Sequence, residues 1–99
     1  MEKAILIKVD GTKQTVKPNN GRDFKFDELG EMLGCELVQV LGSNSTADNI
    51  NLVCDEEGQF NTPDAINVDA TLLAHEYYLI NSNEYLVGNV LFCNAKQIR

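Results

Sequence analysis

No unbroken apolar run in this sequence is longer than four residues, which limits the chain to short secondary-structure elements. Residues 4–7 and 90–93 are apolar runs of four residues, and each has the length of a short β-strand. A membrane-spanning helix needs about 20 mostly apolar residues, so the sequence predicts none. The 99 residues are enough for one domain with one hydrophobic core.

The N-terminal quarter of the chain predicts a β-hairpin. Residues 3–9 are rich in β-branched side chains, and residues 13–17 alternate in polarity as a strand does. Asp10 and Gly11 between them are a strong turn signal. Residues 18–21 then predict a loop, because proline lacks an N–H for the ladder and Asn and Gly tolerate left-handed backbone.

A short helix and a second pair of strands follow. Residues 26–33 predict an amphipathic helix, because apolar positions recur at i, i+3 and i+7 with a glycine at i+4 and two acids occupy the first turn. Gly34 suits the C-terminal cap. Residues 35–41 and 50–54 predict two strands that pair with each other.

The second helix begins near Pro63 or Asn67, since proline suits a first turn and asparagine is a good N-cap. It runs to residue 78 or 79. Residues 86–93 predict the last strand, in which Gly88 marks a bulge or a close backbone approach. Together the segments predict one α+β domain over residues 1–99, with a small mixed or antiparallel sheet of about five strands, two helices and an N-terminal β-hairpin. The apolar stripe of the second helix consists of Ile66, Ala70, Leu73, Ala74 and Tyr77.

The cysteines favour a reduced protein without a metal. Cys35, Cys54 and Cys93 are an odd number with no CxxC spacing, which argues against a disulfide framework and a structural zinc site. Each lies in or beside an apolar segment, where a free thiol behaves as a small hydrophobe. The first residues lack the basic start and apolar stretch of a signal peptide. We therefore expect a cytoplasmic protein with no cofactor and no membrane partner.

Charges are segregated along the sequence. The chain has 15 acidic and 8 basic residues and a formal net charge of −7. Every Lys and Arg lies before residue 26 or after residue 95, so that the segment between carries acids only. One explanation is that a net charge well away from zero keeps a small domain soluble. The segregation leaves two functional alternatives open.

The first alternative is a basic N-terminal hairpin that contacts phosphate groups, and the second is an acidic body that imitates a nucleic-acid backbone. The surrounding negative charge would repel a polyanion, and the basic ends carry few aromatic residues. We therefore do not expect direct binding to nucleic acid. The acidic body, as a decoy for a nucleic-acid-handling protein, stays open.

Four short segments match the pattern of one protein family. They are a KAILI strand at residues 3–7, a DEEG turn at 55–58, an NxxAT helix start at 67–71 and an LVGNVL strand at 86–91. Through them the chain resembles a family of small proteins of phages, mobile elements and bacteria that is classified as a domain of unknown function. The resemblance implies an intracellular phage or mobile-element setting and no catalytic residue. A longer polar loop at residues 42–49 departs from that pattern.

Two groups of residues are candidates for binding. Asn67, Thr71, His75 and Gly88 could border a ligand site, although the first two and the glycine also have structural explanations as cap, back-bonding hydroxyl and backbone approach. Glu76 does not join His75 in a site, because adjacent helical positions point about 100° apart.

The second group is Asp55, Glu56 and Glu57, which lack the alternating oxygen ligands of an EF-hand and suit a solvated turn. The sequence contains no P-loop, GxSxG or HExxH motif, so nothing in it indicates an enzyme. We therefore expect a noncatalytic protein-interaction module of phage or mobile-element type, as a monomer or as a homodimer through an edge strand. The alternative is a small enzyme or ligand-binding protein that uses the first group.

Overall fold

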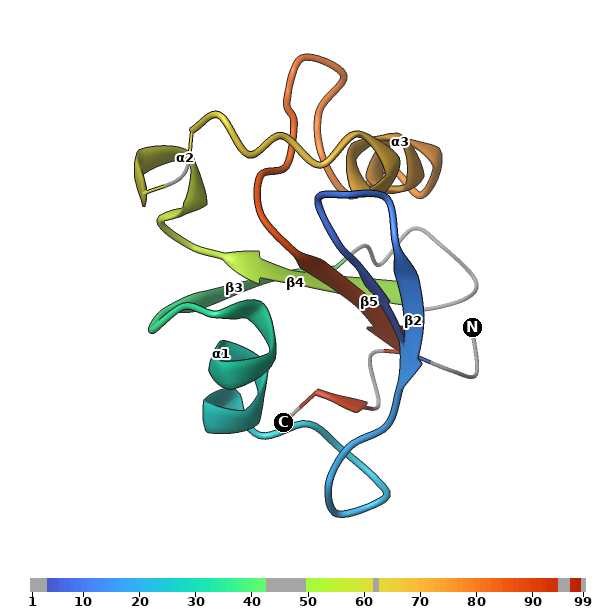
Figure 1. Ribbon diagram of the computed structural model, residues 1–99. Helices are drawn as coiled ribbons and strands as arrows, with labels where there is room; N and C mark the ends of the chain where they lie inside the picture. The colour runs from blue at the N-terminus through green and yellow to red at the C-terminus, as the bar shows by residue number, and fades with distance from the viewer. Residues whose placement is uncertain (1–3, 43–49, 62, 95–96, 99) are drawn as a thin grey trace.

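The computed structural model describes residues 4–42, 50–61, 63–94 and 97–98. Its backbone forms a central β-sheet with helices on both faces (Figure 1). The strands are β1 (Ala4–Ile7), β2 (Lys13–Val16), β3 (Val38–Gly42), β4 (Ile50–Asp55) and β5 (Val90–Asn94). The helices are α1 (Phe26–Leu33), α2 (Gly58–Asn61) and α3 (Val68–Glu76).

The strands of the described chain form one antiparallel sheet in the order β2-β1-β5-β4-β3. The predicted N-terminal hairpin is confirmed as β1–β2, and the predicted central pair is confirmed as β3–β4. Strand β5 pairs with β1 on one side and with β4 on the other, and it joins the two hairpins into one sheet. The predicted α+β fold class is therefore confirmed.

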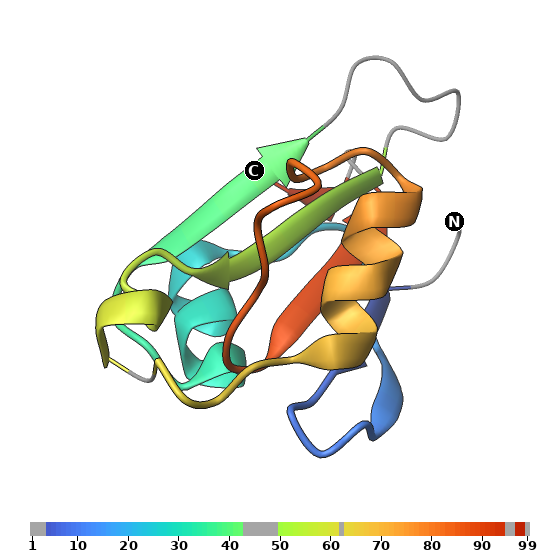
Figure 2. The same ribbon diagram turned by 90° about the horizontal axis from the view of Figure 1, so that it is seen from above.

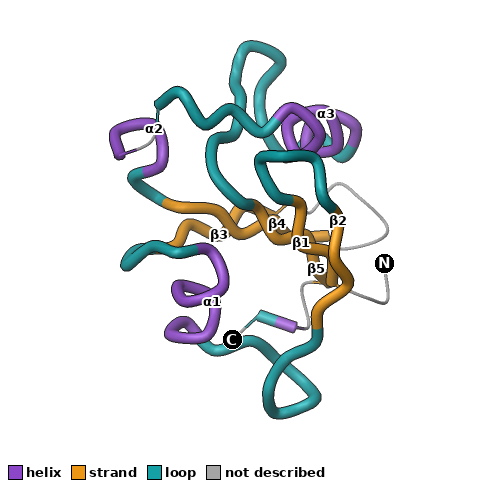
Figure 3. The backbone as a smooth tube through the Cα atoms, in the orientation of Figure 1, coloured by secondary structure: helices purple, strands orange, loops and turns teal. Residues whose placement is uncertain are grey.

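The hydrophobic core has two halves, one on each face of the sheet. Helix α1 covers one face, and α3 covers the other together with the segment that follows it (Figures 1 and 3). Strands β1 and β5 contribute to both halves, which explains why their sequences are continuous apolar runs. The α1 half contains Ala4, Leu6, Phe24, Leu29, Leu33, Val53, Leu91 and Cys93. The α3 half contains Ile7, Ile50, Leu52, Cys54, Ala70, Ala74, Leu86, Val90 and Phe92.

Helix α1 has the bounds that the sequence predicts. It ends at Gly34, whose φ of 72° is left-handed and suits glycine. At its start, the carboxylate of Glu28 accepts the backbone N–H of Lys25 at 3.2 Å and that of Asn19 at 2.7 Å. These bonds attach the helix to the loop that precedes it. Because the helix is bounded by residues within or next to it, its own sequence is enough to predict both ends.

Helix α3 resolves one uncertainty and corrects one expectation. Asn67 is its N-cap and accepts the N–H of Ala70 at 3.0 Å, whereas Pro63 lies in a turn before it. The helix ends at Glu76, earlier than predicted, and Tyr78 follows with a left-handed φ of 58°. Ile66, which the sequence assigned to the apolar stripe, precedes the helix and is 46% exposed.

Strand β5 begins at Val90 and not at residue 86 as predicted. The preceding residues bond to the approach to α3 and not to the sheet: Asn67 donates its backbone N–H to the Leu86 carbonyl at 2.8 Å, and Gly88 donates to Ala65 at 2.7 Å. The Gly88 backbone does lie close to another segment, since its N–H bonds to Ala65, but this approach does not require glycine, because an added Cβ would meet no atom within 4 Å. Its glycine is instead required by a φ of +73°.

Helix α2 is not among the elements predicted from the sequence, and β3 begins at Val38 and not at residue 35. Residues 43–49 of the polar loop lie outside the described residues, as do the basic residues Lys3, Lys96 and Arg99. Within the described segments, every helix falls short of the length and apolar character needed to cross a bilayer.

Candidate functional site

Asn67 is buried at the point where α3, β1 and the segment before β5 meet. Its side-chain oxygen accepts the N–H of Ala70, and its amide nitrogen donates to the carbonyls of Ile7 at 2.8 Å and Gly88 at 2.9 Å. Both amide hydrogens and the oxygen are therefore engaged with backbone. The structure brings Asn67 and Gly88 together, as the candidate site requires. Their hydrogen bond stabilises the fold, however, and leaves no polar group of the Asn67 side chain for a ligand.

Thr71 and His75 continue this attachment along α3. The Thr71 hydroxyl donates to the Asn67 carbonyl at 2.7 Å and accepts the Leu86 N–H at 2.9 Å. His75 Nε2 lies 3.1 Å from the Asn81 carbonyl and 3.0 Å from that of Glu84. Both partners are acceptors only, so Nε2 carries a hydrogen and donates to them. These two side chains therefore fasten the segment before β5 to α3.

The acidic group after β4 forms a turn. Asp55 accepts the N–H of Glu57 at 2.9 Å, and Glu56 donates its own N–H to the Leu37 carbonyl at 3.0 Å, which extends the β3–β4 ladder. Among the residues that the structure describes, no group of three or more His, Cys, Asp and Glu side chains is arranged to hold a metal ion. The turn that the sequence predicts after β4 is present at residues 56–57.

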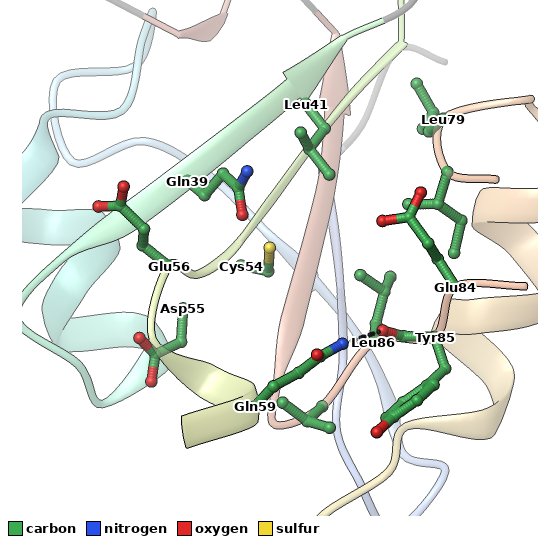
Figure 4. A pocket seen from close by; sticks show the side chains of 12 residues that line it. Gln39, Leu41, Cys54, Asp55, Glu56, Gln59, Leu79, Glu84, Tyr85 and Leu86 are labelled. Atoms are coloured by element: carbon green, nitrogen blue, oxygen red, sulfur yellow. Dashed lines mark hydrogen bonds between the residues drawn. The ribbon is translucent and has the colours of Figure 1, made fainter. Parts of the chain in front are cut away.

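A hollow of about 290 Å³ lies beside this turn, on the α3 face of the sheet. We call it the acidic groove (Figure 4). Strands β3 and β4 and helix α2 form one side of it, and residues 79–87 form the other. Figure 2 shows the backbone of these segments from above. Leu41, Cys54 and Leu86 give its floor an apolar character.

The side of the acidic groove that residues 79–87 form is held in place by several hydrogen bonds. Gln59 of α2 donates from Nε2 to the Tyr85 carbonyl at 3.1 Å, across the end of the groove (Figure 4). The Glu84 carboxylate accepts the Asn81 N–H at 2.9 Å, and His75 binds both of their carbonyls. The predicted candidate His75 therefore contributes to the groove by supporting its wall.

The groove carries one sign of charge. Among the described residues that line it, Asp55, Glu56 and Glu84 are acidic and none is a Lys or Arg. Burial raises the pKa of the Cys54 thiol to about 11, and the neighbouring Asp55 carboxylate adds to that rise. The thiol therefore stays protonated at neutral pH, and the carboxylates alone set the charge of the groove.

The described lysines of the hairpin lie at the opposite end of the sheet. Strands β2 and β3 are its two edges, four strand spacings or about 19 Å apart. This exceeds the screening length of about 8 Å at physiological salt. Lys13 of β2 is also paired with Asp69 of α3 at 3.5 Å. Bases and acids therefore mix where Lys13 meets Asp69, whereas the acidic groove at the β3 edge lies far from the hairpin lysines.

A second hollow, of about 390 Å³, runs along β2 beside α1. Lys17 lines it together with Glu28 and Glu31, so opposite charges share this surface. The acidic groove, with its uniform charge and apolar floor, is the better candidate although it is smaller.

Part of the acidic groove was predictable from the sequence. Asp55 and Glu56 were candidates and line it, whereas Glu57, Asn67, Thr71, His75 and Gly88 do not. No local sequence pattern predicts that Gln59 or residues 79–85 line the groove, because it combines separate segments. A comparison with known protein families, curated proteins and solved structures finds no match to this chain. The resemblance to the phage and mobile-element family therefore stays a prediction.

Proposed function

We propose that this chain is a noncatalytic protein-interaction module whose acidic groove binds a Lys or Arg side chain of a partner protein. The observation that carries the proposal is the combination of three carboxylates with an apolar floor. Asp55, Glu56 and Glu84 supply the negative charge, and Leu41 and neighbouring apolar side chains can contact the methylene groups of a long basic side chain.

Exposed aromatic side chains support a protein partner. Tyr85 lines the groove and is 42% exposed, and Phe60 lies next to Gln59 on α2 and is 85% exposed. Aromatic residues are enriched in protein interfaces, and their ring faces attract the guanidinium of arginine. These two rings therefore suit a partner that carries arginine.

The noncatalytic assignment is supported by the bonding of the first candidate group. The side chains of Asn67, Thr71 and His75 are directed at backbone groups, so no observation favours the alternative of a small enzyme or ligand-binding protein at that position. A partner that normally handles nucleic acid is a special case of the proposal. The acidic surface would then take the place of the phosphate backbone.

A flexible basic peptide tests this proposal. The probe is fluorescein-labelled Gly-Arg-Gly-Arg-Gly-Arg-Gly amide, and fluorescence anisotropy measures its binding to the full chain. We expect saturable binding that Glu56→Lys weakens about tenfold, because the change replaces an attraction with a repulsion in the groove.

Glu31→Lys is the matched control, since it changes the net charge equally from an exposed position on α1, outside the acidic groove. We expect this variant to bind within about twofold of the unmodified chain. Absence of saturable binding, or equal losses in the two variants, would contradict the proposal.

A further inference from the structure

The free edge of β3 borders the acidic groove. The bond from the Glu56 N–H to the Leu37 carbonyl identifies these two as a hydrogen-bonded pair of the antiparallel ladder. Such pairs alternate with non-bonded ones along two antiparallel strands. Val38, Val40 and Gly42 therefore direct their N–H and C=O groups away from β4. Among the described residues, nothing pairs with these groups.

The two edges of the sheet differ in how they resist pairing. Strand β2 begins with Lys13 and is followed by Lys17 and Pro18, and charged residues and proline are features that keep edge strands from pairing. Strand β3 has the sequence VQVLG, which contains neither a charge nor a proline. Of the two edges, β3 is therefore the one able to accept another strand.

The side chains of β3 connect this edge to the groove. Gln39 and Leu41 line the acidic groove, whereas Val38 and Val40 pack against the α1 half of the core. A strand added beside β3, about 4.8 Å away, would place every second side chain next to the groove. The alternate side chains of the added strand would lie on the other face, beside Val38 and Val40. The surface thus suits a strand in which basic and apolar residues alternate.

We propose that the partner's binding segment is an extended strand with alternating basic and apolar residues, which pairs with the free edge of β3 as an added strand. This inference rests on the proposed function and names the form of the segment that the groove binds. Backbone bonds to β3 would provide affinity, and the carboxylates would select the basic residues. A β3-to-β3 pair of two copies is disfavoured because it would bring two acidic grooves together.

The test uses a strand-forming peptide, acetyl-Thr-Arg-Val-Arg-Val-Arg-Thr amide, in three fluorescein-labelled forms. One is unmodified, one has N-methyl groups on its three arginines, and one has them on its two valines and last threonine. In a strand, one of these alternate sets directs its N–H groups toward β3 and the other directs them to solvent. We expect one methylated peptide to bind at least about tenfold more weakly and the other within about twofold.

A chain variant provides the second arm. Val38→Pro removes an N–H that points away from β4, and proline is tolerated at the first position of an edge strand. We expect it to weaken the unmodified strand peptide about tenfold and to leave the flexible Gly-Arg peptide within about twofold, with folding checked by circular dichroism.

The outcomes separate this inference from the proposed function. If the flexible peptide binds through Glu56 but the two methylated peptides bind equally, strand addition is wrong and the groove proposal stands. If neither peptide binds, both are wrong. Light scattering tests whether a second copy of the chain occupies the β3 edge. A molecular mass that rises with protein concentration, and falls when the strand peptide is added, would contradict the proposal that the occupant is a different protein.

Discussion

At the scale of single residues, the buried Asn67 side chain makes three hydrogen bonds to backbone groups of three different segments. It is 1% exposed and contacts the first turn of α3, the end of β1 and the turn at Gly88. Its type was recognisable as an N-cap from the sequence, because the cap depends on local spacing. Its two long-range bonds were not, because Ile7 is 60 residues away.

We expect Asn67→Ala to lower the free energy of unfolding by about 3 kcal/mol, since it removes a helix cap and leaves two carbonyls without their donor. Asn67→Ser is the matched variant, because serine keeps a capping oxygen but cannot reach both carbonyls. It should fall between the alanine variant and the unmodified chain in urea unfolding. Equal stability of all three proteins would contradict this role.

The buried thiols predict a loss of stability at alkaline pH. Burial raises the pKa of Cys93 to about 12 and that of Cys54 to about 11, whereas an unfolded thiol ionises near pH 8.5. Burial of the neutral thiols therefore stabilises the fold fully below about pH 8.5, and this contribution is lost as the pH rises toward 11 and 12. Urea unfolding under reducing conditions measures the slope.

Each buried thiol should contribute up to about 1.4 kcal/mol of lost stability per pH unit above pH 8.5. Cys93→Ala should therefore flatten the decline between about pH 8.5 and 10.5. Cys35→Ala is the control, because Cys35 is only partly buried and its smaller rise in pKa should give a smaller change. A slope that neither variant alters would exclude the thiols as its cause.

At the scale of elements, the sequence predicts those that local signals define. Helix α1 has the expected bounds because its period, acidic first turn and Gly34 cap all act within the helix. The start of β5 was missed because residues 86 and 88 bond to residues 65–67, which no local pattern reveals. The acidic groove was only partly predicted for the same reason, since it combines β3, β4, α2 and residues 79–87.

The attachment of residues 81–88 to α3 predicts how the groove wall responds to mutation. Thr71→Val keeps the side-chain shape but removes the bonds to the Asn67 carbonyl and the Leu86 N–H. We expect a loss of about 1–2 kcal/mol in unfolding free energy and faster hydrogen exchange at Leu86. Thr71→Ser keeps the hydroxyl and should retain slow exchange. Equal exchange in the two variants would show that these bonds do not hold the wall.

At the scale of the whole molecule, the fold places the basic hairpin far from the acidic groove, although Lys13 of the hairpin pairs with Asp69 of α3. The basic hairpin β1–β2 and the acidic groove lie at opposite edges of the sheet, because β5 and β4 are inserted between them. A net charge of −7 alone would attract any cationic protein without a preferred position. The groove adds a position, since the carboxylates lie beside an apolar floor and a free strand edge.

The salt dependence of binding and two substitutions that each remove one charge distinguish attraction by the net charge from binding at the groove. Binding of the flexible basic peptide should weaken about tenfold between 50 and 500 mM salt, as the screening length falls from about 14 to 4 Å. A salt-insensitive complex would contradict the acidic-decoy case.

At 150 mM salt, Glu56→Gln should weaken binding about threefold, because it removes a charge in the groove. Lys13→Gln makes the chain more negative by one charge, yet it lies at the far edge, so binding should change by less than about 1.5-fold. If the net charge governed binding, the lysine variant would bind more tightly by the same factor that the glutamate variant loses.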